Sequence, residues 1–258
     1  MILEKKLKND YNNLSQKKKV ISICHVNKSF GSNHVLIDFN LELLEGENLV
    51  VLGKSGSGKS VLIKCIIGLL KIDSGNINVF DENISDMNEE SLDKIRAEVG
   101  FLFQSNALYD SMTVRENLEF PLRRHSLSKT QNEVNTLVKE ALEDVGLVHT
   151  IDMMPAELSG GMRKRIALAR TLILKPKIIL YDEPTTGLDP ITAKEIIELI
   201  KKIQSKYYTA SLIITHDMNC VRMASNRVAI LIDGKCYIVG TFEALVLNKD
   251  PIIHQFFE

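Results

Sequence analysis

The sequence is poor in the residues that mark several classes of protein. It has no tryptophan, aromatic residues make up 6% of its 258 residues, and the formal net charge is −1. A balance this close to neutral does not favour nucleic acid as a partner, and we expect none. No apolar run in the sequence approaches the roughly 20 residues of a membrane-spanning helix. The cysteines lie far apart, without the spacing of a metal site, and are expected to be reduced core thiols: Cys24, Cys65, Cys220 and Cys236.

Lysine is concentrated at the start of the chain, where residues 1–20 hold six lysines against two acidic residues. Such a segment is typical of a solvated tail, and the alternative is contact with lipid head groups. We therefore expect residues 1–19 to form a polar tail and residues 20–258 to form the folded domain.

Apolar runs predict an α/β fold with two kinds of β-structure. Long runs joined by a turn at Gly31 predict an antiparallel layer, and short runs between helical patterns predict a parallel sheet buried on both faces. The expected strands of the layer are Val20–Phe30, His34–Leu44 and Gly75–Ile84. Those of the core are Asn48–Leu52, Val99–Phe103, Lys177–Tyr181 and Ser211–Thr215, with a closing hairpin at Val228–Asp233 and Lys235–Val239.

The strand pattern disappears between Phe103 and Leu174. Capping-box patterns at Thr113–Glu116 and Ser128–Gln131 predict two helix starts there. We expect a helical subdomain, over about residues 105–174, inserted between strands of the catalytic core.

A glycine-rich segment follows the strand at Asn48–Leu52 and opens a helix at Lys59. Glycines at this spacing let backbone N–H groups turn toward an anion at a helix N-terminus, which is the phosphate loop of nucleotide-binding proteins. We expect Lys59 to reach the β- and γ-phosphates and the Ser60 hydroxyl to bind Mg²⁺. The segment reads Gly53-Lys54-Ser55-Gly56-Ser57-Gly58-Lys59-Ser60.

Polar residues end several of the predicted core strands. Asp182 is placed to bind Mg²⁺, through water, and Glu183 to polarise an attacking water as general base. Gln104 could touch both the metal and that water, and His216 could donate to the γ-phosphate. The predicted catalytic residues are thus Glu183, His216, Gln104 and Lys59, and the predicted metal ligands are Ser60, Gln104 and Asp182.

A second glycine-rich segment, Leu158–Gly161, precedes a helix predicted over Met162–Ile173. Its two glycines, Gly160 and Gly161, permit close approach of backbone N–H groups to an anion. The segment belongs to the helical subdomain, so we do not expect it to share a γ-phosphate with its own phosphate loop. A two-fold pair of chains would set Ser159 of each against the ATP of the other, which predicts a homodimer.

From about Val20 to its end, the sequence resembles the nucleotide-binding subunits of ATP-binding cassette (ABC) transporters. The resemblance implies a P-loop NTPase core of RecA-like type with an antiparallel β layer and an inserted helical subdomain. It also implies hydrolysis of ATP with Mg²⁺ and a separate integral-membrane permease, which would hold the chain at the cytoplasmic face of the membrane. The family's motifs occur here in order: the phosphate loop, Gln104, Leu158-Ser159-Gly160-Gly161, Asp182-Glu183, Gly187-Leu188-Asp189 and Thr215-His216-Asp217.

Two further residues draw their roles from this resemblance. Asp189 would lie at the seam between the two protomers. Phe30 stands where an aromatic ring stacks on adenine in the family, but it could equally be a packed strand residue, and the sequence leaves both readings open.

Met162 stands where the family usually has glutamine. With the following Arg163-Lys164-Arg165, it resembles the ATPases of MCE-type intermembrane lipid transporters, the Mla phospholipid system. Residues 102–110, 181–190 and 250–256 are similar to the same group. This narrower resemblance implies phospholipid transport and an MCE-domain lipid-binding protein as a further partner.

Three alternatives stay open from the sequence. The chain could serve another ABC transporter, for amino acid import or lipoprotein release. It could be a soluble cassette ATPase of translation or DNA maintenance, although it has neither a second cassette nor long coiled coils. It could also be a non-catalytic nucleotide-binding module, against which the catalytic set argues: Lys59, Asp182, Glu183 and His216.

Overall fold

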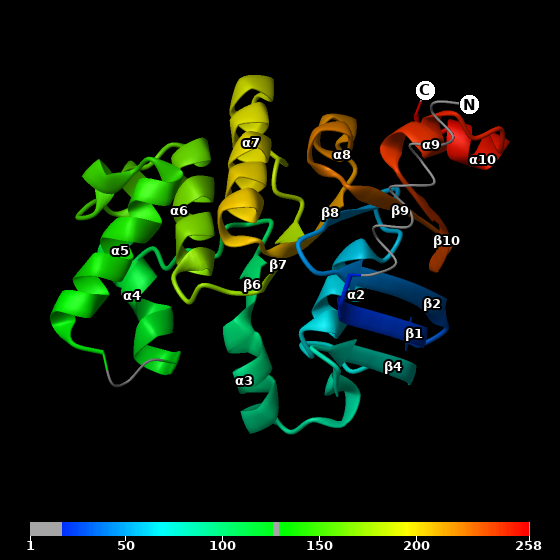
Figure 1. Cartoon of the computed structure of the whole chain (residues 1–258), viewed down its shortest axis with the longest axis horizontal. Coiled ribbons are helices and arrows are strands. Elements are labelled where there is room, and N and C mark those ends of the chain that lie inside the picture. The colour runs from blue at the N-terminus through cyan, green and yellow to red at the C-terminus, as the bar shows by residue number, and fades with distance from the viewer. Residues whose placement is uncertain (1–16, 126–128, 258) are drawn as a thin grey trace.

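The computed structural model describes residues 17–125 and 129–257, which form two sheets and a helical lobe (Figure 1). The first strand begins at Lys19, close to the predicted start of the domain. Residues 1–16 hold most of the predicted tail and lie outside the described part of the chain.

The smaller sheet is antiparallel, as predicted, with the order β2-β1-β4-β5. The prediction of one continuous strand over Gly75–Ile84 is wrong. The chain turns at Phe80 and Asp81, which have positive φ angles of 52° and 68°, and a 3₁₀ turn follows at Ile84–Asp86. The strands are β1 (Lys19–Phe30), β2 (Asn33–Leu44), β4 (Ser74–Val79) and β5 (Glu82–Asn83).

The larger sheet has the order β10-β9-β3-β8-β7-β6. Its strands run parallel from β9 to β6, and β10 pairs antiparallel with β9, which confirms the predicted parallel core and closing hairpin. The strands are β3 (Asn48–Leu52), β6 (Val99–Leu102), β7 (Ile178–Asp182), β8 (Ala210–Thr215), β9 (Arg227–Ile232) and β10 (Lys235–Gly240).

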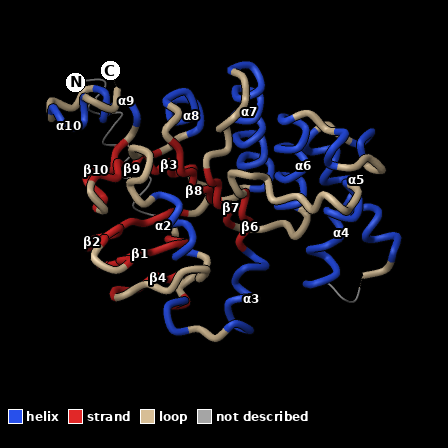
Figure 2. Tube along the Cα trace, turned by 180° about the vertical axis from the view of Figure 1, so that it is seen from behind, coloured by secondary structure: helices blue, strands red, loops and turns tan. Residues whose placement is uncertain are grey.

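Helices cover both faces of this sheet. Helices α2 (Lys59–Ile66) and α3 (Glu89–Glu98) lie on one side, and α7 (Pro190–Tyr207) and α8 (Met218–Ala224) lie on the other (Figures 1 and 2). Alternate strand residues feed two cores: Val50 and Leu52 join one, whereas Leu49 and Val51 join the other. Two short helices follow the hairpin, α9 (Phe242–Val246) and α10 (Pro251–His254).

The helical lobe lies between β6 and β7 in the chain and consists of α4 (Val114–His125), α5 (Gln131–Val145) and α6 (Gly160–Leu172), as Figure 1 shows. A capping box does start α4, where Thr113 and Glu116 bond reciprocally. The second predicted box is misplaced: α5 is capped by Thr130 with Glu133, and Ser128 lies outside the described residues.

This topology decides where the functional residues meet. Strands β3, β6, β7 and β8 are parallel, so their carboxyl ends share one edge of the sheet. The phosphate loop leaves that edge after β3, Gln104 follows β6, the acidic pair ends β7 and His216 follows β8.

Candidate active site

A cavity of about 340 Å³ opens at the carboxyl edge of the parallel strands, beside the phosphate loop. The sequence-predicted residues that line it are Phe30, Ser55, Gly56, Gly58, Lys59, Ser60, Gln104, Glu183 and His216. The structure therefore brings together residues from the end of β1, from the phosphate loop and from the ends of three other strands.

Within the phosphate loop, Gly58 occupies a position that favours glycine. Its φ is +100°, and a Cβ added there would lie 2.8 Å from Val35 Cγ1. Gly53 and Ser57 do not line the cavity. They pack on one another beneath the loop, where a Cβ on Gly53 would meet Ser57 Oγ at 2.7 Å.

Lys59 is the first residue of α2, and its ammonium group lies under the loop. Nζ donates to the carbonyls of Gly53 at 2.7 Å and Lys54 at 3.0 Å, and it lies 3.7 Å from Glu183 Oε1. Burial lowers the pKa of Lys59, and the nearby carboxylates of Glu183 and Asp182 oppose that shift. The cation is thus held at the floor of the cavity, where an anionic phosphate would be attracted.

Glu183 is held in a strained backbone conformation directly after β7. Its φ is +49°, which is costly for a residue with a Cβ, and its N–H donates to the Ile214 carbonyl at 2.9 Å. The side chain is buried and accepts from Thr215 Oγ1 at 3.2 Å and Thr186 Oγ1 at 3.3 Å. His216 Nδ1 lies 3.0 Å from both carboxylate oxygens.

Sequence reasoning gave no role to the two threonines that hold this carboxylate. Thr215 directly precedes His216 at a strand end, and that adjacency was the available signal. Thr186 gave no such signal, because only the turn after Glu183 carries its hydroxyl back to the carboxylate, at 3.3 Å.

Asp182 and Ser60 supply the oxygen atoms that a magnesium ion prefers. Ser60 Oγ donates to Asp182 Oδ1 at 3.2 Å, and burial raises the pKa of that carboxyl. Across residues 17–125 and 129–257, no three His, Cys, Asp or Glu side chains are grouped closely enough to hold a metal by themselves. A hydroxyl, one carboxylate and the exposed Gln104 amide fit an ion that takes its other ligands from phosphate and water.

The Ser159 segment is placed elsewhere. None of Ser159, Gly160 and Gly161 lines the cavity at the phosphate loop. Ser159 caps α6 by accepting from the Met162 N–H at 3.2 Å, so the helix begins at Gly160, two residues earlier than predicted.

The two glycines of the Ser159 segment have different surroundings. A Cβ on Gly161 would meet Thr192 Cγ2 at 2.6 Å, so this glycine is needed for close packing of α6 on α7. A Cβ on Gly160 would find its nearest neighbour, Leu188 Cδ2, in ordinary contact at 3.9 Å, and Gly160 is exposed. Asp189, expected at the protomer seam, caps α7 by accepting from the N–H groups of Ile191 and Thr192.

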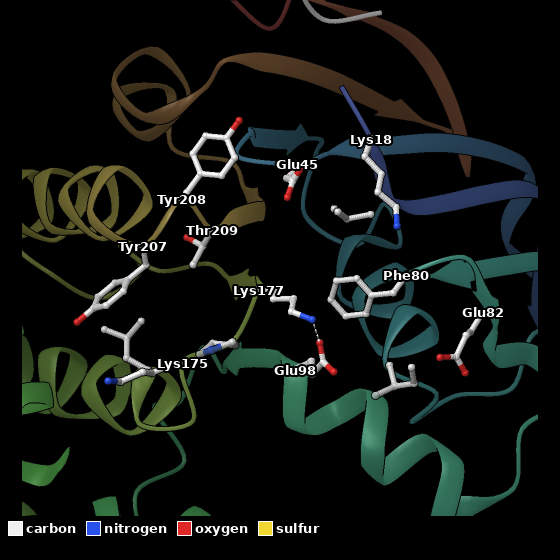
Figure 3. A pocket seen from close by; sticks show the side chains of 14 residues that line it. Lys18, Glu45, Phe80, Glu82, Glu98, Lys175, Lys177, Tyr207, Tyr208 and Thr209 are labelled. Atoms are coloured by element: carbon white, nitrogen blue, oxygen red, sulfur yellow. Dashed lines mark ion pairs between the residues drawn. The ribbon is translucent and has the colours of Figure 1, made fainter. Parts of the chain in front are cut away.

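A separate cavity of about 670 Å³ lies at the opposite edge of the sheet (Figure 3). Lys177 and Thr209, which precede β7 and β8, line it together with Phe80, Tyr207 and Tyr208. Lys177 is paired there with Glu98 at 2.5 Å. None of the predicted site residues lines this cavity, and those of the phosphate loop and strand ends lie at the other edge.

The chain matches known proteins over most of its length. A family model described as "ABC transporter" matches residues 36–186. The "Probable ribonucleotide transport ATP-binding protein mkl" of Mycobacterium leprae is 39% identical over 236 residues, which cover 92% of this chain and 68% of that protein. The "Methionine import ATP-binding protein MetN" of Clostridium acetobutylicum is 41% identical over 229 residues, which cover 89% of this chain and 71% of that protein.

Solved structures agree with these relatives. The dimeric ATP-binding cassette MJ0796, bound to ADP and Pi, has a TM-score of 0.78 and 32% identity, covering 86% of this chain and 98% of that one. The structure of cbiO1 from Clostridium perfringens, part of the ABC transporter complex cbiONQ, has a TM-score of 0.80 and 27% identity, covering 94% and 100%.

In the described part of the chain, every helix is too short or too polar to span a bilayer.

The parallel core with its inserted helical lobe, the phosphate loop beside Glu183, the family match and the similar solved cassettes agree with one another. The chain belongs to the ABC transporter family, and it is an ATP-binding ATPase whose hydrolysis of ATP is coupled to transport.

Proposed function

We propose that two copies of this chain bind two ATP molecules between them and drive a separate membrane permease. One observation carries this proposal: the cavity beside Lys59 and Glu183 lacks the Ser159 segment, while Ser159 and Gly160 of that segment are exposed. A second protomer could complete the cavity with its own Ser159 segment. The dimeric form of the solved cassette MJ0796 supports this arrangement.

The residues around the cavity can divide the chemistry of hydrolysis among them. The loop N–H groups and Lys59 would bind the β- and γ-phosphates, and Phe30, at the end of β1, would stack on adenine. Ser60, Asp182 and Gln104 would hold Mg²⁺, which neutralises charge on the transferred phosphoryl group when bound. Glu183 would orient the attacking water, and His216 would donate to the γ-phosphate.

The permease contact is proposed at the segment Gln104–Pro121, between the core and the helical lobe. Two aromatic side chains of this segment, Tyr109 and Phe120, are exposed and contact one another with ring centroids 4.8 Å apart and ring planes tilted by 51°. A pair of exposed aromatic rings suits burial by a helix of a partner protein. Peripheral attachment at the cytoplasmic face of the membrane follows from this contact.

The transported substrate is proposed to be a phospholipid, carried together with an MCE-domain partner. The support is the sequence pattern at Met162 and in three other stretches. The basic run after Met162 does not itself present a lipid-binding surface, because each side chain is engaged within the protomer. Arg163 donates to the Leu158 carbonyl at 2.7 Å, Lys164 to the Gln104 carbonyl at 2.9 Å and Arg165 to Glu195 at 2.6 Å.

Purification of the chain with its permease tests both levels of the proposal. We expect co-purified phospholipid by mass spectrometry, and ATPase activity that rises when phospholipid vesicles are supplied. Absence of bound lipid, together with stimulation by ribonucleotides, would contradict the lipid assignment. Failure of the Glu183→Gln variant to dimerise with ATP would contradict the shared-site proposal itself.

A second candidate substrate is methionine. The relatives named as methionine import proteins, with identities up to 41%, favour it over other amino acids. The same purified complex would then respond to L-methionine and not to phospholipid, so one set of ATPase assays separates the two candidates.

A further inference from the structure

Two cations of helix α6 hold the backbone of the segment that begins at Gln104. Lys164 Nζ donates to the Gln104 carbonyl at 2.9 Å. Arg170 donates to the carbonyls of Ala107 at 2.8 Å and Asn106 at 3.1 Å. Three carbonyl groups of one short loop therefore point at a single helix, and that helix is the one capped by Ser159.

The backbone of the loop is bent to make these contacts. Asn106 and Ala107 have positive φ angles of 66° and 52°, which are unusual for residues with a Cβ. Such conformations persist where surrounding contacts impose them. Here the contacts that turn the carbonyls toward α6 are those of Lys164 and Arg170.

Burial of a charged lysine at position 164 costs more free energy than burial of an apolar side chain would. The Lys164 side chain is 2% exposed, and an ammonium group removed from water costs free energy that a methionine of similar volume would avoid. The ammonium group donates instead to the carbonyl of Gln104, a residue that lines the ATP cavity. The location of this cation therefore indicates a positioning role.

The contacts continue toward the aromatic pair at which a permease is proposed to dock. Arg170 lies 5.7 Å from the Tyr109 ring and 3.4 Å from Asn117 Oδ1. The Asn117 amide donates to the carbonyls of Tyr109, Met112 and Thr113 at 3.0–3.1 Å. Backbone carbonyls at several points between Gln104 and Thr113 are thus tied to α6 directly or through Asn117.

We propose that Lys164, supported by Arg170, is a positioning residue that fixes Gln104 to the helix bearing Ser159. Engagement of Gln104 at its own ATP and of Ser159 at the partner's ATP then occurs as one movement of α6. This inference rests on the proposed homodimer with shared ATP sites, because only there do the two residues serve different nucleotides.

The test uses ATP-dependent dimerisation of the full chain in a Glu183→Gln background, measured by analytical ultracentrifugation. Lys164→Met removes the donor but preserves volume, and we expect the dimerisation constant to weaken about tenfold or more, as for loss of a hydrogen bond from a charged group. Binding of Mg–ADP to the monomer should change less than about twofold, because the phosphate loop keeps its own contacts. Lys164→Arg should restore dimerisation, since it returns a cationic donor.

A matched control is Arg96→Met. Arg96 also holds two backbone carbonyls, those of Ile67 at 3.0 Å and Gly68 at 3.1 Å, but these lie at the end of α2. Its loss should lower thermal stability without weakening dimerisation. If Lys164→Met does not fold, Lys164→Gln, whose amide has a shorter reach, should give the same loss of dimerisation.

The outcomes separate the inference from the proposed function. Dimerisation of the Lys164→Met variant as strong as that of its Glu183→Gln parent would overturn the positioning role. Failure of the Glu183→Gln parent to dimerise with ATP would overturn the shared-site proposal instead. If Arg96→Met weakens dimerisation as much as Lys164→Met does, the effect of Lys164 is one of general stability, and this result would also contradict the inference.

Discussion

The phosphate loop and the Ser159 segment both place glycines at the start of a helix, but their surroundings differ. At the phosphate loop, Gly58 lies against Val35, and the Lys59 ammonium is held by loop carbonyls beside Glu183. At the start of α6, Gly161 is packed against α7 while Gly160 is exposed and has its nearest neighbour at 3.9 Å. The phosphate loop thus lines a cavity of its own chain. The Ser159 segment is packed against α7 at Gly161 and exposed at Gly160.

This difference indicates how a single chain could supply both halves of an ATP site that two protomers share. The residues proposed to do chemistry are assembled within the protomer, because they follow or end neighbouring parallel strands. The Ser159 segment, which is proposed to contact the partner's nucleotide, lies on a separate lobe, so in the proposed dimer ATP binding would depend on the meeting of two protomers. Substitutions in and around the two segments test this difference.

The largest expected effect is at the cavity floor. Glu183→Gln keeps the shape of the side chain but removes its basicity, and we expect turnover to fall at least ~100-fold, or about 3 kcal/mol in the barrier. ATP binding should persist, because the phosphate loop is untouched. Phosphate release and nucleotide titration measure the two quantities, and turnover at the native rate would remove Glu183 from this role.

Loss of the loop cation should act on binding. Lys59→Ala deletes the ammonium group at the cavity floor, and we expect ATP affinity to fall about tenfold or more, since hydrogen bonds to charged groups contribute about 1.5–3 kcal/mol. The control is Lys54→Ala, in the same loop, whose exposed side chain does not line the cavity. Isothermal titration should show weakened binding for Lys59→Ala alone, and equal affinities would contradict the phosphate-loop assignment.

The two glycines of the Ser159 segment give a paired comparison on stability. Gly161→Ala forces a methyl group against Thr192, and we expect a loss of about 1–3 kcal/mol in the free energy of unfolding. Gly160→Ala meets no close neighbour and should change it by no more than about 0.5 kcal/mol. Denaturant unfolding of the nucleotide-free monomer measures both. Equal losses would show that the two positions are packed alike.

The smallest effect concerns the four cysteines. The rate at which a reagent modifies each thiol measures its burial and does not depend on ATP hydrolysis. Burial raises the pKa of Cys65 and of Cys236 to about 11 and that of Cys220 to about 12, so little thiolate forms near pH 8. Cys24 is exposed. A thiol reagent at pH 8 should therefore modify Cys24 quickly and the other three only after denaturation. Rapid reaction of Cys65 in the folded protein would contradict the tight packing of α2 beneath the phosphate loop.

Much of the fold follows from patterns that are local in the sequence. A glycine spacing after an apolar run encodes the phosphate loop, because the required backbone angles depend on a few adjacent residues. Strand β3 lies at its predicted residues for a similar reason, since five buried residues leave it no exposed face. Errors occurred where two local signals compete. The run from Gly75 to Ile84 is broken by a turn at Phe80 and Asp81, and Thr130 takes the cap that the pattern at Ser128 predicted.

What the sequence determined by itself is which charged and polar groups end or follow the core strands: a cation at Lys59 in the phosphate loop, carboxylates at Asp182 and Glu183, and a histidine at His216. The tertiary structure decided how those groups are held. Thr215 and Thr186 fix the Glu183 carboxylate, and Gly161 is required by a helix 31 residues further on. Lys164 reaches a carbonyl 60 residues away. Contacts at such separations depend on how helices pack on the sheet, and no short pattern in the chain encodes that packing.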